Sequence, residues 1–216
     1  MHRDCILFDM DGVLIDSEYC MRLSSILALK EYGIEATHED FMEFTGMGED
    51  RFIGGVVEKY GKPYSAEMKA RAYAIYDQIA EDNVILYEGI HQLVLRLKEL
   101  GYKVAVGSAA DLTKVKINLR CIGLTPKDFD ALVTGSDIVR KKPDPEIFLT
   151  AASRIGATPD RCIVVEDAVS GVQAAKAAGM LAIGVTGTFD SATLRAAGAD
   201  YTVEKTQQML EIIKDL

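Results

Sequence analysis

The stretch Cys-Ile-Leu-Phe-Asp-Met-Asp-Gly-Val at residues 5–13 decides the fold of this 216-residue chain. Four apolar residues run directly into Asp9, and a second acid, Asp11, follows two positions later with Gly12 behind it. A short apolar run that ends at a turn signal is typical of a buried parallel strand. Ligand sites in open α/β sheets lie outside the carboxyl ends of such strands, so the pattern places Asp9 at a binding edge.

Two acids this close together at a strand end indicate a bound cation. Burying a carboxylate is costly, and a second acid nearby raises its pKa unless a positive charge neutralises the pair. Carboxylate oxygens suit a hard ion such as Mg²⁺. Asp-x-Asp pairs are also common in solvated loops, so this motif needs support from the rest of the chain.

The composition is that of a globular, acidic protein. Hydrophobic residues make up 49% and charged residues 26% of the chain, which favours a sizeable core over disorder. The net charge of −9 argues against nucleic acid or an anionic membrane surface as a partner. Three histidines and four scattered cysteines offer little for a catalytic triad or a zinc site, and the cysteines are expected to be reduced and buried. No signal peptide or membrane span is evident, so we expect a soluble cytoplasmic protein. The sequence leaves the oligomeric state open, and a monomer is the expectation.

The sequence after the first strand predicts helices rather than further strands. Helical patterns cover about residues 48–61 and 65–82. Before them, Thr37 and Asp40 have the spacing of a helix-capping pair. We therefore expect residues 17–84 to form a helical bundle inserted after the first strand.

The pattern then changes to short apolar runs that alternate with helices. Strands are expected near residues 102–107, 131–134, 162–165 and 181–185, with helices near 90–100, 111–122, 145–155 and 169–178. Such alternation is typical of a parallel, doubly wound α/β sheet. The predicted organisation is an α/β core formed by residues 1–16 and 85–216, with residues 17–84 as a helical cap.

Three later segments each bring a polar group to the same predicted edge of the sheet. Ser108 follows a strand, and its small hydroxyl suits a phosphoryl oxygen, although a turn or capping role is the alternative. Lys142 precedes Pro143, which favours an extended connection from which an ammonium can reach a carboxylate or a phosphate. Adjacent lysines are also often a solvated surface. Glu166 and Asp167 end another strand, where they suit either a metal shell or the N-terminus of the next helix.

The order of these signals is more specific than any one of them. Asp-x-Asp-Gly, a strand-end Ser, Lys-Pro and Glu-Asp together resemble the haloacid dehalogenase superfamily of phosphotransferases, over essentially the whole chain. The placement of the insert is similar to the β-phosphoglucomutase and phosphoglycolate phosphatase subgroup. This resemblance implies catalytic roles for Asp9 as nucleophile, Asp11 as acid and base, Ser108 and Lys142, phosphate binding by Ser108, Ala109 and Lys142, and Mg²⁺ ligation by Asp9, the Asp11 backbone carbonyl, Glu166 and Asp167.

The resemblance implies a Mg²⁺-dependent phosphatase that acts on a small phosphorylated metabolite, favouring a sugar phosphate, through an aspartyl-phosphate intermediate. A sugar-phosphate mutase is the alternative. Mutases of that type carry a Lys before the glycine of the first cap loop, an Arg shortly after it, and a His in the first linker. Thr45, Glu49 and Met21 stand at or near those positions here, which favours the phosphatase. Arg51 offers a substitute from a shifted register and is expected to contact the substrate.

A non-enzymatic phospho-receiver module is the third hypothesis. Receivers carry an Asp, a hydroxyl and a Lys in a similar order, but they are much shorter and lack a helical insert. In the enzyme hypotheses the insert acts as a lid over Asp9, because an exposed site would admit water at every step. Its hinges are expected around residues 16–17 and 85–87.

Overall fold

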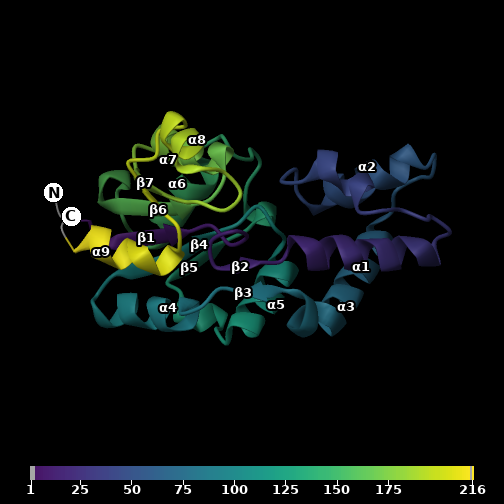
Figure 1. Ribbon diagram of the computed structural model, residues 1–216, viewed down its shortest axis with the longest axis horizontal. Coiled ribbons are helices and arrows are strands. Elements are labelled where there is room, and N and C mark those ends of the chain that lie inside the picture. The colour runs from purple at the N-terminus through teal and green to yellow at the C-terminus, as the bar shows by residue number, and fades with distance from the viewer. Residues whose placement is uncertain (1–2, 215) are drawn as a thin grey trace.

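The computed structural model describes residues 3–214 and 216. Its centre is a parallel sheet with the strand order β5-β4-β1-β6-β7-β8 (Figure 1). The strands are β1 (Cys5–Phe8), β4 (Lys103–Gly107), β5 (Ala131–Val133), β6 (Cys162–Glu166), β7 (Leu181–Val185) and β8 (Tyr201–Val203). Because β1 pairs with both β4 and β6, the first apolar run of the sequence forms the middle of the sheet.

The sheet is covered by helices on both faces. Alternate side chains of β1 point in opposite directions, so Ile6 and Phe8 enter one apolar core while Cys5 and Leu7 enter another. The first core is closed by α4 (Ile90–Glu99), α5 (Leu112–Ile122) and α9 (Met209–Ile213), and the second by α6 (Glu146–Arg154), α7 (Val169–Ala177) and α8 (Ser191–Ala196). This arrangement confirms the predicted doubly wound α/β fold.

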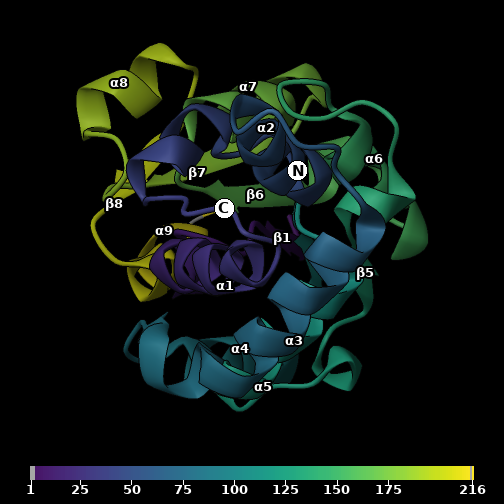
Figure 2. The ribbon, with the colours of Figure 1, turned by 90° about the vertical axis from the view of Figure 1, so that its right-hand side faces the viewer.

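The helical insert lies beyond the carboxyl ends of the strands, as Figure 2 shows with the insert in front. It consists of α1 (Glu18–Glu31), the 3₁₀ helix η1 (Glu39–Phe44), α2 (Glu49–Lys59) and α3 (Ala66–Asn83). These helices share an apolar core of their own, to which Ile117 of α5 also contributes. The predicted capping pair is present, because the Thr37 backbone N–H donates to Asp40 Oδ2 at 2.9 Å. We refer to this insert as the cap; the division of the chain at residues 17 and 84 stays a proposal.

The two connections between sheet and cap run side by side. β2 (Ile15–Asp16) and β3 (Ile85–Leu86) form a two-residue antiparallel ladder, in which Asp16 pairs with Ile85. The sequence predicts short connections at these places, but it does not predict that the two connections pair as strands. Two residues are too few to show an alternating pattern, so the sequence gives no strand signal there.

Other elements were also missing from the sequence analysis. The edge strand β8 and the short helices α8 and α9 were not predicted, and neither were the 3₁₀ helices η2 (Pro126–Asp128), η3 (Gly135–Asp137), η4 (Pro159–Arg161) and η5 (Thr206–Gln208). β8 has three residues and only Val203 among them is buried, so it lacks the apolar run that marks the inner strands. The predicted helices of the core agree with the observed ones to within a few residues.

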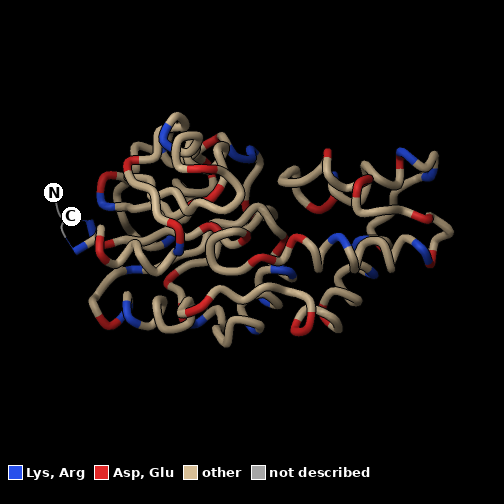
Figure 3. The backbone as a smooth tube through the Cα atoms, in the orientation of Figure 1, with Lys and Arg blue, Asp and Glu red and all other residues tan. Residues whose placement is uncertain are grey.

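The surface and the cysteines agree broadly with the expectations from composition. Acidic and basic residues are interspersed over both the core and the cap (Figure 3). Cys5, Cys20 and Cys162 are buried and free, whereas Cys121 is only half-buried. Within residues 3–214 and 216, no helix has the length and apolarity needed to cross a membrane.

Candidate active site

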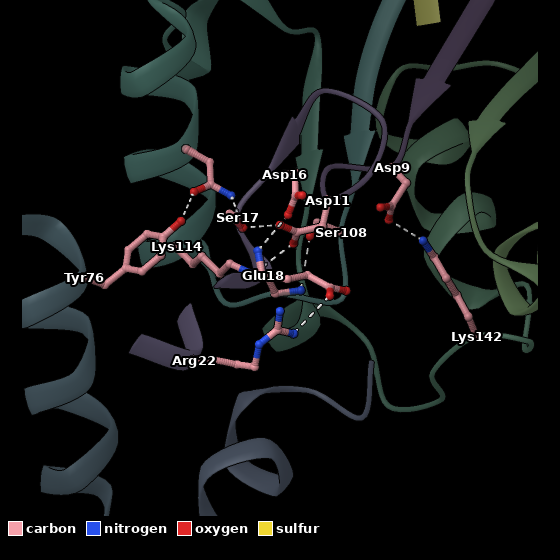
Figure 4. Close-up of polar contacts among 12 residues, drawn as sticks. Asp9, Asp11, Asp16, Ser17, Glu18, Arg22, Tyr76, Ser108, Lys114 and Lys142 are labelled. Atoms are coloured by element: carbon pink, nitrogen blue, oxygen red, sulfur yellow. Dashed lines mark hydrogen bonds and ion pairs between the residues drawn. The ribbon is translucent and has the colours of Figure 1, made fainter. Parts of the chain in front are cut away.

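The predicted polar residues meet at the carboxyl edge of the three central strands. Asp9 directly follows β1, Ser108 follows β4, and Glu166 ends β6 with Asp167 behind it. Since β4, β1 and β6 are neighbours in the sheet, their ends lie side by side. Lys142 reaches this edge from the connection between β5 and α6, and Figure 4 shows its ammonium facing Asp9.

Lys142 bridges two of the acids. Its Nζ lies 2.5 Å from Asp9 Oδ1 and 2.6 Å from Glu166 Oε1, and it also stands 4.9 Å from the centre of the Phe148 ring. Burial alone would lower the pKa of Lys142, but the Asp9 and Glu166 carboxylates outweigh it and raise the pKa. Lys142 therefore remains charged in this site, which rules out a merely solvated surface lysine.

The acids still exceed the positive charge. Burial raises the pKa of Asp9 to about 7, because the Lys142 ammonium opposes the rise only in part. Burial, Glu166 and Asp9 together raise the pKa of Asp167 to about 8, although Thr188 Oγ1 donates to its Oδ2 at 2.6 Å. A further cation beside these two acids would stabilise their ionised forms. The raised pKa values of Asp9 and Asp167 therefore favour the binding of a cation between them.

The donor set fits a hard cation held by few carboxylates. Gly12 has φ of +77°, and a Cβ at this position would collide with the Asp167 carboxylate. The Asp11–Gly12 backbone thus lies directly against Asp167, where oxygen ligands suited to Mg²⁺ are gathered. In the part of the chain that the structure describes, no three His, Cys, Asp or Glu side chains form a metal-binding group. Mg²⁺ commonly uses only one or two carboxylates with waters and phosphates, so two acids and a carbonyl suffice.

Glu166 is held by protein groups instead. Its Oε1 accepts from Lys142, and its Oε2 accepts from the Ala168 backbone N–H at 2.7 Å. A Cβ at Gly171 would collide with this carboxylate, so glycine in the first turn of α7 makes room for it. These bonds favour contact of Glu166 with a metal through water over direct ligation, which stays a prediction.

Ser108 lies in a turn that explains part of its presence. Its backbone N–H donates to Val133 O at 2.9 Å, and its Oγ accepts from the Ala110 N–H at 3.2 Å. Asp111, not Ser108, is the N-terminal cap residue of α5. The structural role is therefore that of a turn serine. The phosphate contacts of Ser108 and the half-buried Ala109 remain predictions.

Asp11 is fixed by a buried polar chain that the sequence analysis missed. Lys114 Nζ lies 2.9 Å from its Oδ2, and Ser17 Oγ donates to its Oδ1 (Figure 4). Asn118 Nδ2 donates to Ser17 Oγ at 3.3 Å, and Asn118 Oδ1 in turn accepts from the Tyr76 hydroxyl at 2.5 Å. The chain thus joins the core to α3 of the cap.

A signal for two of these residues was present in the sequence. Lys114 and Asn118 are four residues apart on α5, on the same side as the buried Val115 and Leu119. Polar side chains at buried helical positions require polar partners. Burial alone would lower the pKa of Lys114, and the Asp11 carboxylate outweighs it, so Lys114 also stays charged.

Arg51 is not brought together with the other residues. Its Nη1 lies 2.7 Å from Glu58 Oε2 at the surface of the cap, and its guanidinium stands 5.0 Å from the centre of the Phe44 ring. Contact with a substrate would require Arg51 to leave the ion pair with Glu58. Its role in substrate binding stays an untested prediction.

A cavity of about 470 Å³ adjoins the acidic edge. It lies between the hinge and the loops that follow β7 and β8, and its lining includes Gly12, Asp16, Tyr87, Asp167 and Thr188. Asp167 thus borders this cavity from the side of the core.

Known proteins with similar sequences identify the family of this chain. Residues 3–179 match the sequence profile of the haloacid dehalogenase-like hydrolases. The protein SUPPRESSOR OF QUENCHING 1, chloroplastic, of Arabidopsis thaliana is 43% identical over 197 residues, which are 89% of this chain but only 19% of that protein. Phosphorylated carbohydrates phosphatase of Thermotoga maritima is 29% identical, with 99% of each chain covered.

A solved structure agrees in fold over the full length. The crystal structure of CbbY from Rhodobacter sphaeroides in complex with phosphate superimposes with a TM-score of 0.85 at 25% identity, and covers 99% of this chain and 100% of CbbY. The family profile matches well over half of the chain, including the ends of β1, β4 and β6 and the segment that carries Lys142. The chain belongs to the haloacid dehalogenase-like hydrolase family.

Proposed function

We propose that this protein is a Mg²⁺-dependent phosphatase that hydrolyses a small phosphorylated metabolite, with a sugar phosphate as the favoured class. The observation that carries the proposal is the buried Asp9 carboxylate, held 2.5 Å from Lys142 Nζ at the centre of the strand edge, with Asp11 two residues away. A carboxylate in that position is suited to attack a phosphorus atom. The phosphatase name of the carbohydrate-specific relative supports the same class of reaction.

Binding is assigned to groups that neutralise the phosphoryl oxygens. Lys142 already touches the nucleophile, so its ammonium can contact both the Asp9 carboxylate and a phosphoryl oxygen. Ser108 and Ala109 supply a hydroxyl and a backbone N–H from the adjacent strand end. Such positioning provides most of the catalysis in phosphoryl transfer, where the transferred group needs in-line attack and charge stabilisation.

The reaction runs in two displacements. Asp9 attacks the phosphorus atom, the bond to the ester oxygen breaks, and Asp11 donates a proton to that oxygen, which leaves as an alcohol. A water molecule then attacks the aspartyl-phosphate, Asp11 accepts its proton, and inorganic phosphate leaves with Asp9 restored. Lys114 contacts Asp11 Oδ2 and Ser17 donates to Oδ1, so these residues position the side chain, and each proton transfer requires one of the two contacts to be exchanged for the substrate or the attacking water.

Mg²⁺ would be held by Asp9, Asp167 and the Asp11 backbone carbonyl, with Glu166 contributing through water. The ion would supply the positive charge that lets two acids and a phosphate dianion share one site.

The alternative of a sugar-phosphate mutase is less well supported. A mutase of this type needs cap residues that hold a second phosphate. Thr45 and Met21 offer no charge, Arg51 is paired with Glu58, and Glu49 brings a negative charge. The receiver hypothesis is disfavoured by the hydrolase family and by the helical cap. The net charge of −9 supports the proposal that the protein binds neither nucleic acid nor membrane. A cytoplasmic location and a monomeric state also remain part of the proposal.

A phosphate-release screen tests the proposal. Purified protein is incubated with a panel of phosphorylated metabolites in Mg²⁺, with a parallel series in excess chelator. We expect Mg²⁺-dependent release from at least one sugar phosphate and no release in chelator. The panel includes β-glucose 1-phosphate with and without a sugar bisphosphate activator. Isomerisation of that compound without net release would support the mutase, and full activity in chelator would refute the metal requirement.

A further inference from the structure

Glu49 is a buried acid of the cap, and one of its two carboxylate oxygens has no hydrogen-bond partner among the described residues. It is the first residue of α2 and is only 8% exposed. Its Oε2 accepts no hydrogen bond from any residue that the structure describes. Buried carboxylates are normally paired or hydrogen-bonded, and an unpaired one calls for an explanation such as a ligand.

The segment that carries Glu49 contacts the core beside the reacting edge. The neighbouring Asp50 lies 2.8 Å from Lys69, which itself lies 3.0 Å from Asp111 at the start of α5. The pKa of Glu49 agrees with this placement, because burial raises it, the Lys114 ammonium opposes the rise, and Asp111 and Asp11 add to it. Under the proposed function Asp11 protonates the leaving oxygen, so Glu49 lies beside the place proposed for the leaving group.

The neighbouring glycine places the same loop on the other side of the site. A Cβ at Gly48 would collide with the ammonium group of Lys141, next to Lys142. The segment around Glu49 thus reaches from Lys141 on one side to Lys69 and Asp111 on the other. Gly48 lies against the core residue Lys141, and Lys69 links Asp50 to the core residue Asp111, so contacts with the core position Glu49 in this structure.

The local charge is negative. The acids near this point are Glu49, its neighbour Asp50, Asp11 and Asp111, and the cations are Lys114, Lys69 and Lys141. Lys114 lies 2.9 Å from Asp11, and Lys69 lies 2.8 Å from Asp50 and 3.0 Å from Asp111. The Lys141 ammonium lies against Gly48. Four acids thus face three ammonium groups. A second anionic group on the substrate would meet net repulsion here, whereas a hydroxyl would find an available acceptor.

We propose that Glu49 determines substrate specificity by accepting hydrogen bonds from hydroxyl groups of the leaving group and by excluding leaving groups that carry a carboxylate or a second phosphate. The inference rests on the proposed phosphatase function and deepens it. The predicted substrate class is the monophosphate of a neutral polyol or sugar. A site built around a polar acceptor discriminates strongly against substrates that leave this acceptor unpaired.

Two matched pairs of substrates test this inference. Glycerol 3-phosphate and 3-phosphoglycerate differ only by replacement of a CH₂OH group with a carboxylate, as do sorbitol 6-phosphate and 6-phosphogluconate. The measured quantity is the ratio of kcat/KM within each pair, from phosphate release in Mg²⁺. The proteins compared are the wild type, Glu49→Gln and the control Glu43→Gln. Glu43 is also an acid of the cap, in η1, but its side chain is exposed and pairs with Lys59.

We expect the wild type to prefer the polyol member of each pair by roughly tenfold or more. Glu49→Gln should bring both ratios roughly tenfold closer to one, because the amide retains an acceptor oxygen but removes the charge. Glu43→Gln should leave both ratios within about twofold of the wild type. An equal loss on all four substrates in Glu49→Gln, with unchanged ratios, would reveal a structural role and overturn the inference.

Folding and general activity are monitored separately. Glu49→Gln should not lower the midpoint of thermal unfolding, since the substitution is isosteric and removes an unpaired buried charge. If the variant did not fold, a wild-type preference for the anionic members would still overturn the inference. Failure of the wild type to release phosphate from any ester, including 4-nitrophenyl phosphate, would refute the proposed function itself.

Discussion

Lys142 keeps two acids of the site in place that would otherwise repel each other. The Asp9 and Glu166 carboxylates both accept from its ammonium group, at 2.5 and 2.6 Å. Burial of this three-residue cluster would be costly for any member alone, and removal of one partner leaves the others uncompensated. The nucleophile is therefore preorganised before a substrate arrives.

Replacement of Asp9 by Asn should abolish turnover while the protein stays folded. The amide oxygen can still accept from Lys142, but the side chain loses both its nucleophilic oxygen and its charge towards a metal. We expect phosphate release to fall by roughly a thousandfold or more, with little change in far-UV circular dichroism. Asp160→Asn, at an exposed position of η4, serves as the control. Turnover of Asp9→Asn at the wild-type rate would end the covalent mechanism.

The stability of the metal-free protein should decrease as the pH rises through neutrality. The pKa values of Asp9 and Asp167 in the folded protein, about 7 and about 8, lie above the ordinary value of 3.8. The folded state thus retains protons that the unfolded state has released, and their contribution to stability is complete below pH 4 and lost as the pH passes 7 to 8. Between those limits the free energy of unfolding falls by about 1.4 kcal/mol per pH unit for each retained proton.

Denaturant titrations in chelator at pH 6 and pH 8.5 measure this effect. Asp167→Asn should flatten the dependence on pH, because one of the two raised groups is gone. Addition of Mg²⁺ to the wild type should restore stability, and more so at pH 8.5 than at pH 6, since the ion competes with the retained protons. A free energy of unfolding that rises between pH 6 and pH 8.5 in chelator would contradict the prediction.

At the scale of elements, α2 is fitted to the cap by a pair of glycines. Gly54 and Gly55 are both buried in the middle of the helix, where glycine normally weakens helical structure. A Cβ at Gly55 would collide with the Phe44 ring, which precedes the loop that carries Glu49. A Cβ at Gly54 would stand 3.3 Å from Tyr64 Cγ, a tight contact that a small movement of the Tyr64 ring relieves.

Gly55→Ala should therefore destabilise the protein, and Gly54→Ala should not. We expect a loss of roughly 1–3 kcal/mol for Gly55→Ala from overpacking, against a change near zero for Gly54→Ala, where helix propensity offsets the tight contact. Urea denaturation of both variants measures the difference. Displacement of Phe44 should also raise KM for a polyol phosphate in Gly55→Ala. Greater stability of Gly55→Ala than of the wild type would show that the ring moves freely.

The elements differ in how far the sequence predicts them, and the reason is local. The strands β1, β4, β6 and β7 are buried on both faces, so the sequence of each is a nearly continuous run of apolar residues. The edge strand β8 and the hinge strands are short and partly exposed, and their pairing depends on distant segments. The strand ends were therefore predictable, and with them Asp9, Ser108 and Glu166.

Contacts that depend on tertiary packing were not predictable in the same way. The ion pair of Lys114 with Asp11 forms only because the fold brings α5 next to the end of β1. The hydrogen bond from Tyr76 to Asn118 likewise forms only because α3 packs on α5. Arg51 and Glu49 are two residues apart on α2, and sequence spacing does not say which of them faces the core. The structure directs Arg51 towards Glu58 and buries Glu49.

At the scale of the whole molecule, the cap is joined to the core along α3 and α5. Tyr76 donates to Asn118 at 2.5 Å, Lys69 lies 3.0 Å from Asp111, and Ile117 of α5 belongs to the apolar core of the cap. These contacts are buried or partly buried, unlike strand β3 of the hinge ladder, whose two residues are exposed. A movement of the lid that preserves them would swing α2 and its loop while α3 stays against α5.

Tyr76→Phe should weaken both the fold and the proton transfers at Asp11. Removal of the hydroxyl leaves the buried Asn118 Oδ1 without its donor, which should lower the free energy of unfolding by roughly 1–3 kcal/mol. It also loosens the hydrogen bonds that connect Asn118 through Ser17 to Asp11. We expect a decrease in kcat with a smaller change in KM. Tyr60→Phe is the matched control, because its hydroxyl binds Asp40 at the surface and should cost less than about 1 kcal/mol. Equal effects of the two substitutions would argue against coupling between cap and catalytic acid.

The ladder at the hinge has a consequence for how such proteins diversify. Asp16 and Ile85 are direct neighbours across β2 and β3, so the polypeptide departs from the sheet and returns to it at almost the same point. A foreign module with closely spaced ends can be spliced in there without straining β1 or β4. Substrate range can thus be exchanged by recombination while the reaction chemistry is inherited unchanged. The graft must, however, bring a surface that docks on α5, so successful chimaeras should require co-transfer or redesign of the partner residues on that helix.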